Sequence, residues 1–180
     1  LIALNIDLVV QNVLSNVTEQ NTERLTPVFD EENPIGATGL MRTWYTTKPC
    51  FPTTKSHISH LVGDSAWEGH AANIFEKRED VLAYAKNDHL GFQIYYMWAG
   101  SRRRYVPDFM VRLAGGTILA LEIKGTDSPQ NKAKRDALNE WVKAINAAGG
   151  FGRWSWDVAF KPAEVQDIIT KHAAVAEPVA

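Results

Sequence analysis

The stretch from residue 105 to residue 125, YVPDFMVRLAGGTILALEIKG, consists of two apolar segments joined by the loop residues 114–116, Ala-Gly-Gly. Glycine adopts the left-handed backbone conformation that a three-residue hairpin loop requires. The two segments are therefore predicted to pair as antiparallel strands, with Phe109 opposite Leu121. This hairpin constrains the fold more than any other feature of the sequence, because its register determines which side chains share a face.

The same register places Asp108 opposite Glu122, with Lys124 pointing to the same side two residues later. Acidic side chains are rarely buried unless they are paired or bind a metal. Two carboxylates held close together favour a cation between them, and an oxygen-only ligand set suits Mg²⁺ or Mn²⁺ better than zinc. Lys124 suits an anionic substrate. The alternative is a solvated ionic cluster at a sheet edge, in which Arg104 and Lys124 pair with the carboxylates.

The composition bounds the size and class of the protein. The chain has 180 residues, 45% apolar and 22% charged, with a formal net charge of −2. These values are typical of one globular domain, and any nucleic-acid surface must be a local patch rather than a property of the whole molecule. A single cysteine, Cys50, excludes an internal disulfide framework and a cysteine-based zinc site. The chain also lacks an apolar run of the ~20 residues needed to span a membrane.

The remaining elements are predicted from periodicity, caps and breakers. Helices are expected at about 6–17, 64–77, 80–86, 129–148 and 161–172, strands at 40–47, 91–98 and 153–160, irregular segments at 21–39 and 48–57, and a basic turn at 100–104. The expected fold class is α/β, with a central mixed sheet flanked by helices. Residues 1–39 are predicted to form an amino-terminal helix and connector, and residues 40–180 a single domain. Since the chain begins with Leu1, we expect it to be part of a longer polypeptide.

The residues of the hairpin carry a family resemblance. Pro107-Asp108 followed by Glu122-Ile123-Lys124 resembles the motif of the PD-(D/E)xK nuclease superfamily, whose restriction-endonuclease-like core has the order α-β-β-β-α-β. More narrowly, SHISHLVGDSAWE, YVPDF, LEIKG and NEWVKAIN are similar to the carboxy-terminal endonuclease domain of type III restriction enzyme Res subunits. The similarity covers about residues 46–160.

The resemblance implies roles for individual residues. Asp108 and Glu122 would be catalytic residues and ligands of Mg²⁺, for which Mn²⁺ can substitute, together with the carbonyl of Ile123, and Lys124 would be the catalytic lysine. The superfamily often adds an acidic residue from its first helix, and Glu68 matches that position. Glu68 also stands three residues after Ser65, as in a capping box. The sequence leaves both interpretations of Glu68 open.

Basic residues flank the predicted site on both sides. We expect DNA phosphates to be held by Arg102, Arg103 and Arg104 before the hairpin and by Lys132, Lys134 and Arg135 after it, with Gln130 near the lysine, as in related nucleases. His57 and His60 have no third ligand nearby and are not expected to bind a metal. Tyr105 is interpreted as a packing residue.

The expected function is therefore a metal-dependent DNA endonuclease domain that hydrolyses phosphodiester bonds with a metal-activated water. The resemblance implies double-stranded DNA as substrate, amino-terminal helicase-like motor domains that use ATP in the parent chain, and a modification (methyltransferase) subunit as partner. The sequence GATG at residues 36–39 lacks a P-loop lysine, so no ATP site is expected in this chain. A cytoplasmic location without membrane association is expected. The alternatives are another nuclease of the superfamily, in defence or repair and fused to a helicase, or a catalytically silent DNA-binding or docking module.

Overall fold

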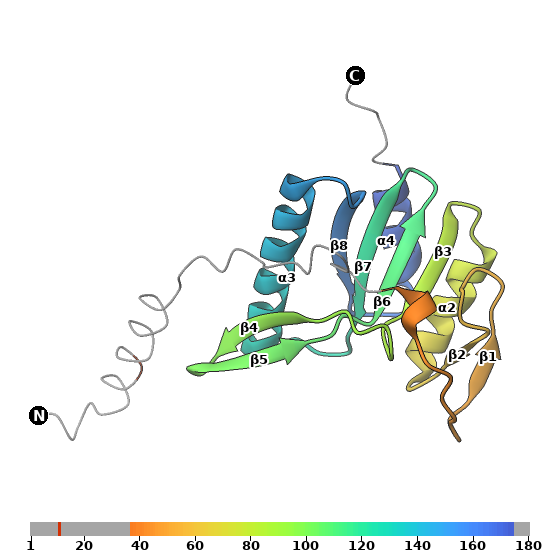
Figure 1. Cartoon of the computed structure of the whole chain (residues 1–180), viewed down its shortest axis with the longest axis horizontal. Coiled ribbons are helices and arrows are strands. Elements are labelled where there is room, and N and C mark those ends of the chain that lie inside the picture. The colour runs from red at the N-terminus through yellow and green to blue at the C-terminus, as the bar shows by residue number, and fades with distance from the viewer. Residues whose placement is uncertain (1–10, 12–36, 175–180) are drawn as a thin grey trace, which may run out of the picture.

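The computed structural model describes residue 11 and residues 37–174 (Figure 1). In chain order the described elements are η1 (Thr38–Leu40), β1 (Cys50–Pro52), β2 (His60–Val62), α2 (Ala66–Lys77), β3 (Val81–Lys86), β4 (Ile94–Trp98), β5 (Ser101–Tyr105), β6 (Phe109–Leu113), β7 (Thr117–Ile123), α3 (Pro129–Ala148), β8 (Arg153–Ala159) and α4 (Glu164–Ala173). The fold class is α/β with a mixed central sheet, as predicted, and the described residues contain three α-helices. The helix expected near residues 6–17 and nearly all of the 21–39 connector lie outside the described residues.

The central sheet has four strands in the order β3-β6-β7-β8. β6 is antiparallel to both β3 and β7, while β8 runs parallel to β7 after the chain has passed through α3. Two further sheets have two strands each, β1 with β2 and β4 with β5. A bilayer-spanning helix is not found in the part of the chain that the structure describes.

The predicted hairpin register is confirmed. Phe109 pairs with Leu121, and Val111 pairs with Leu119. Gly116 has φ of 80°, which is the left-handed conformation that the three-residue loop requires. The alternation of side chains along β6 and β7 therefore follows the prediction, and it sets the two faces of the sheet.

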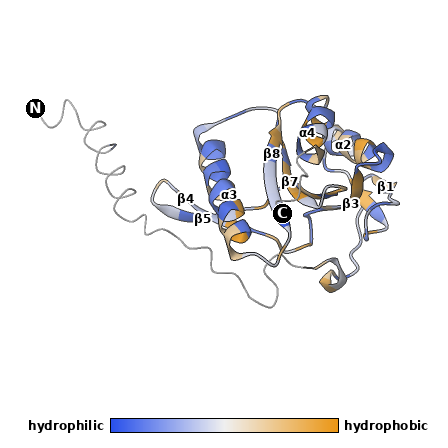
Figure 2. Cartoon of the chain, turned by 90° about the horizontal axis from the view of Figure 1, so that it is seen from above, coloured by the Kyte–Doolittle hydropathy of each residue, from blue (hydrophilic) through white to orange (hydrophobic). Residues whose placement is uncertain are grey.

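Two apolar clusters cover the opposite faces of the sheet. One contains Phe109, Val111 and Leu121 and packs under α2 and α4. The other contains Met110 and Ala120 and packs against α3, β4 and β5. Figure 2 shows α2 and α4 together on one side of the sheet, with α3 on the other. Since neighbouring residues of β6 enter different clusters, the sheet is the middle layer of the domain.

The helix boundaries follow the predicted caps. Ser65 accepts a hydrogen bond from the amide of Glu68 at the start of α2, and Ser128 accepts one from the amide of Asn131 at the start of α3. α3 begins at Pro129 and ends before Gly149, whose φ is 69°. Proline at the first turn and a left-handed glycine after the last are the expected start and stop signals.

Two predicted elements before the hairpin are wrong. The segment 80–86, predicted as a short helix, is strand β3, because it pairs with β6 along the edge of the central sheet. The segment 100–104, predicted as a basic turn, is mostly strand β5, which pairs with β4. In both cases pairing with a distant strand outweighs local composition.

Two predictions nearer the amino terminus are also wrong. The segment 40–47 is expected to form a strand, but Leu40 ends η1 and residues 41–47 have no regular structure. The 48–57 segment, predicted as irregular because of its two prolines, contains β1, and Pro52 stands at the end of that short strand. This position in a two-stranded sheet tolerates a residue without a backbone donor.

Candidate active site

The site predicted from the hairpin lies at the end of the central sheet where β6 begins and β7 ends. Glu122 alternates with Leu121 and Ile123, so its side chain points to the face that carries α3, β4 and β5. Tyr105, at the end of β5, reaches the same place from that face. The site is thus assembled from two adjacent sheet strands and the strand that precedes them.

Asp108 lies just before β6 and is held by the backbone on both sides. Its Oδ2 accepts a hydrogen bond of 2.7 Å from the amide of Ile123 on β7. Its carbonyl accepts one of 2.8 Å from the amide of Asn87. The Asn87 side chain also donates to the carbonyl of Pro107 at 3.0 Å. The Pro-Asp segment is therefore fixed to the end of the sheet rather than free in a loop.

Glu122 is the most buried acidic residue of the site, with 5% of its surface exposed. Its Oε2 accepts a hydrogen bond of 2.7 Å from the hydroxyl of Tyr105. Its Oε1 is 2.6 Å from Nζ of Lys124. A buried carboxylate needs such compensation, and here a phenol and an ammonium group provide it. Lys124 belongs to the same site, as the sequence predicted, and its described ionic partner is Glu122.

The electrostatics of the site disfavour the ionised form of Asp108. Burial, and next the charge of Glu122, raise the pKa of Asp108 to about 7, although the amide of Ile123 acts in the opposite direction. The charge of Glu68 also contributes to the increase. Burial and the neighbouring Glu122 raise the pKa of Tyr105 far above its usual range, so its phenol stays a proton donor. Asp108 therefore lies in a buried environment in which the negative charges of Glu122 and Glu68 disfavour its own ionisation.

Glu68 stands in the first turn of α2 and has two structural partners. Its Oε2 accepts a hydrogen bond of 3.0 Å from the amide of Asp64 and lies 2.9 Å from Nζ of Lys86. The reciprocal half of the capping box therefore reaches Asp64 rather than Ser65. The neighbouring Trp67 ring lies close to Gly125, so the start of α2 adjoins the end of β7. Glu68 is both a cap and a neighbour of the site, and both interpretations stand.

Lys86 is a second buried ionic centre beside the site, and it is a residue that sequence reasoning missed. With 6% of its surface exposed, it donates to the Val62 carbonyl at 2.9 Å and to Asp64 at 2.5 Å, and it also pairs with Glu68 and Asp88. Burial opposes its charged form, but these partners outweigh burial and raise its pKa above the usual range. A lysine inside the apolar segment 81–86 is a feature that could have pointed to this role.

The basic residues expected to bind DNA are distributed over two elements. Arg102, Arg103 and Arg104 are exposed on β5. On α3, Lys132 is exposed, and Nζ of Lys134 lies 5.6 Å from the centre of the Tyr105 ring.

The other two predicted residues on α3 have partners. Gln130 donates to the Tyr96 hydroxyl at 2.7 Å, which connects α3 to β4. Arg135 forms a bidentate ion pair with Asp127. The structure thus brings Lys134 next to the site, while Arg135 is engaged elsewhere.

The structure assigns modest local roles to the remaining candidates. His57 shares a hydrogen bond with Thr38, and His60 shares one with Ser59. Tyr105, interpreted from sequence as a packing residue, is buried as expected but also holds Glu122. Within the described residues, no group of three or more histidine, cysteine, aspartate or glutamate side chains is arranged to hold a metal.

Comparison with known proteins gives no match: no family model, no curated protein and no solved structure is similar to this chain.

Proposed function

We propose that this chain is a divalent-metal-dependent DNA endonuclease domain of the PD-(D/E)xK type, and the cleavage module of a type III restriction Res subunit. The observation that carries the proposal is the convergence of Asp108, Glu122 and Lys124 at one end of the β6–β7 hairpin, with Tyr105 holding Glu122. Burying two carboxylates there raises the free energy of the folded state. Such a cost is typical of functional sites.

The order of the elements supports the proposal. When the β4–β5 pair is set aside as an insertion, the remaining elements follow as α2-β3-β6-β7-α3-β8. This order is compatible with the α-β-β-β-α-β core that the resemblance predicts. It uses β3 rather than the 91–98 segment as the first strand.

The donor set suits Mg²⁺ or Mn²⁺. The carboxylates of Asp108 and Glu122 would hold the ion with the carbonyl of Ile123, and Glu68, which is not grouped with these two side chains among the described residues, would act through a metal-bound water. A divalent cation would offset the repulsion that raises the pKa of Asp108. When bound, such an ion supplies Lewis-acid activation of water and of the phosphate.

The residues of the chain have distinct tasks in this proposal. The Lys124 ammonium can stabilise negative charge that develops on the phosphate oxygens. The Tyr105 phenol fixes the rotamer of Glu122, and the Ile123 amide fixes that of Asp108. Preorganised groups of this kind lower the barrier because they need no rearrangement during the reaction.

The wider assembly is also a proposal. In a type III enzyme, helicase-like motor domains that use ATP would precede this domain in the parent chain, and a modification subunit would select the DNA sequence. The isolated domain is then expected to cut DNA poorly and without sequence preference.

The test compares Lys124→Ala and Asp108→Ala with Lys143→Ala in the complete motor-containing protein, with its partner subunit, ATP and Mg²⁺. Lys143 is an exposed residue of α3 that pairs with Glu140. Lys124→Ala should reduce the cleavage rate by roughly 10²–10³, the loss typical of a donor that stabilises transition-state charge. DNA binding should persist.

The two active-site variants also separate the alternatives. Cleavage that survives both Asp108→Ala and Lys124→Ala would place the nuclease elsewhere and leave this domain as a DNA-binding or docking module. Loss of cleavage in the Lys143→Ala control would show that the assay reports stability rather than chemistry.

A further inference from the structure

The strands β4 and β5 form a two-stranded ribbon, residues 94–105, that extends beside α3 (Figure 1). Its inner face packs on the body of the domain. Ile94, Tyr96 and Tyr105 are 5%, 4% and 3% exposed and belong to the cluster under α3. Gln130 at the start of α3 donates to the Tyr96 hydroxyl. The inner face of the ribbon is therefore packed against the domain, and its outer face is not.

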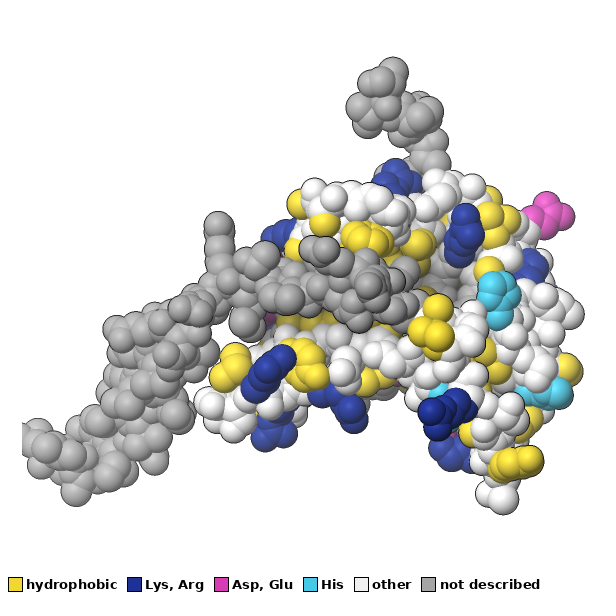
Figure 3. All heavy atoms as spheres, viewed as in Figure 1, with side chains coloured by type: hydrophobic (Ala, Val, Ile, Leu, Met, Phe, Trp, Pro, Cys, Tyr) yellow, Lys and Arg dark blue, Asp and Glu magenta, His cyan; other side chains and the backbone are white. Residues whose placement is uncertain are grey.

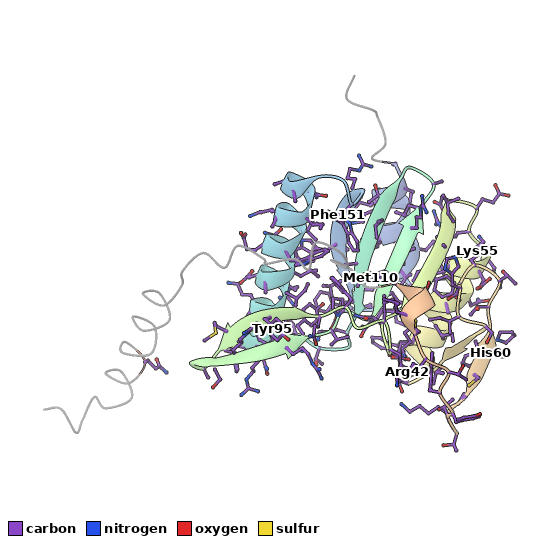
Figure 4. The ribbon with its side chains drawn as sticks, in the orientation of Figure 1. Arg42, Lys55, His60, Tyr95, Met110 and Phe151 are labelled. Carbon is purple, nitrogen blue, oxygen red and sulfur yellow. The ribbon has the colours of Figure 1, made fainter. Side chains whose placement is uncertain are left out.

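The outer face of the ribbon combines aromatic, apolar and basic side chains. Tyr95 pairs with Arg104, and Met97 pairs with Arg102, so these four side chains share one face. Tyr95 is 43% exposed and Met97 42%. The Arg102 guanidinium lies 4.0 Å from the centre of the Tyr95 ring. Figure 3 shows basic and hydrophobic side chains next to one another over the ribbon, and Figure 4 places Tyr95 on it, away from the central sheet.

The ribbon is also strongly basic. The segment 91–107 contains no aspartate or glutamate, whereas Arg102, Arg103 and Arg104 follow one another in it. Among the described residues, none of these arginines forms an ion pair with a carboxylate. The whole chain nevertheless has a net charge of −2. The ribbon therefore carries three positive charges and no negative one, so it has a local positive potential that complements a polyanion.

We propose that the ribbon is a duplex-DNA-binding arm whose outer face enters the major groove. The groove is about 12 Å wide and admits a two-stranded β-ribbon. In this arrangement Arg102 and Arg104 contact base edges or the flanking phosphates, and Tyr95 and Met97 contact the groove floor and walls. The two arginines of the outer face make the phosphate contribution to binding dependent on salt.

The contacts within the ribbon favour a duplex over a single strand. Proteins that bind single strands stack bases on free aromatic faces. Arg102 covers a face of the Tyr95 ring, so that this face is not available to a base. The paired strands also form a continuous narrow element, which matches the shape of a groove rather than that of an extended single strand.

The ribbon also connects bound DNA to the site. Tyr105 is the last residue of β5, and its hydroxyl holds Glu122. Arg103 pairs with the buried Tyr96, so it lies on the inner face, on the same side as Tyr105. The base of the ribbon therefore adjoins Glu122, and a duplex that continued past this end of the ribbon would come within reach of the carboxylates. This last step rests on the proposed nuclease function, whereas DNA binding by the ribbon does not.

The test measures binding of the 180-residue chain to a short fluorescent duplex, without divalent metal and over a range of salt concentrations. The variant is Arg102→Gln/Arg104→Gln, and the charge-matched control is Lys143→Gln/Lys161→Gln, which removes one exposed lysine on α3 and one between β8 and α4. The ribbon variant should bind about 10- to 100-fold more weakly, and its salt slope should fall by about 2, because two phosphate-neutralising charges are lost. Since both arginines are exposed, the melting temperature should not change.

A duplex with bulky glucosyl groups in its major groove supplies the second measurement. It should bind the native chain much more weakly than the unmodified duplex does. Equal binding of the two duplexes, tighter binding of a single strand, or undiminished binding by the ribbon variant would overturn the proposal. The last result is the one expected if the ribbon docks on a protein instead.

The active-site variants separate this proposal from the proposed function. Asp108→Ala and Lys124→Ala are measured for cleavage in the complete protein, and the ribbon variant is measured for duplex binding. If cleavage survives in both while the ribbon variant loses duplex binding, the nuclease assignment fails and the arm remains.

Discussion

Replacing Asp108 by asparagine should stabilise the protein above neutral pH. The fold buries this carboxyl beside Glu122 and raises its pKa from 3.8 to about 7. A group whose pKa is higher in the folded state binds protons more tightly there, so stability is lost as pH rises through that pKa. Asparagine has the same shape and remains neutral, and its oxygen can still accept the hydrogen bond from the Ile123 amide.

The size of the effect follows from the pKa difference. Each pKa unit is worth about 1.4 kcal/mol, so ionising Asp108 costs the fold about 4 kcal/mol at pH 8 and less than about 1 kcal/mol at pH 4. The amide nitrogen of asparagine needs a hydrogen-bond partner of its own, and this requirement reduces the expected stabilisation by about 1 kcal/mol. Asp108→Asn should therefore raise the free energy of unfolding at pH 8 by about 2–3 kcal/mol, or the melting temperature by about 4–10 °C.

The assay is urea unfolding of both proteins at pH 8 and pH 4 in the presence of a chelator. The matched control is Asp136→Asn, an exposed carboxylate on α3 that should show little change. Mg²⁺ added at pH 8 should then stabilise the native protein and leave Asp108→Asn almost unaffected. A variant that is no more stable than the native protein at pH 8, or equally stabilised at both pH values, would refute the account of this carboxylate.

Three further predictions concern single side chains. Glu68→Gln keeps an acceptor for the helix cap but loses the charge near the site. The cleavage rate should therefore fall about 10- to 100-fold, while the free energy of unfolding changes by less than about 2 kcal/mol. Unchanged cleavage would assign Glu68 to the cap alone. Tyr105→Phe removes the hydroxyl that holds Glu122, so calorimetric titration should show divalent-metal affinity about 10- to 100-fold weaker. Burial opposes ionisation of Asp157, but hydrogen bonds, first from His172, outweigh burial and lower the pKa of Asp157 to about 2. Its contribution of about 2 kcal/mol to the free energy of unfolding should therefore be present above pH 4 and lost as the pH falls through about 2. Acid unfolding of Asp157→Ala, compared with the native protein, should show this loss.

The hairpin and its three ionic residues were predictable because all the information lies within residues 105–125. Strict alternation sets the faces, and the glycines set the loop, so the register needs no distant contact. The same locality explains why α2 and α3 were predicted with their caps. Each cap is formed by residues that lie three positions apart in the sequence.

The rest of the site depends on contacts between distant segments. β3 has the composition of a short helix, and only its pairing with β6 makes it a strand. Tyr105 precedes Glu122 by 17 residues, and Lys86 meets Asp64 across 22. Local periodicity carries no information on such pairs. Sequence patterns therefore indicate only that Tyr105 is a packing residue, and they do not identify Lys86 as a buried ionic centre.

The base of the ribbon has a consequence for how such domains diversify. The side chain of Asn87, at the end of β3, donates to the carbonyls of Phe92 and Pro107, so one amide closes the loop through which the chain leaves and re-enters the central sheet. The exposed outer-face residues between these two points, such as Tyr95 and Arg102, can therefore change without altering the pairing of β3 with β6, whereas the buried Tyr105 must be kept to hold Glu122. Under the proposed roles, exchange of these outer-face residues between homologous chains would change the DNA preference and leave the residues around Asp108 and Glu122 in place, which makes the outer face of the ribbon a natural unit for engineering.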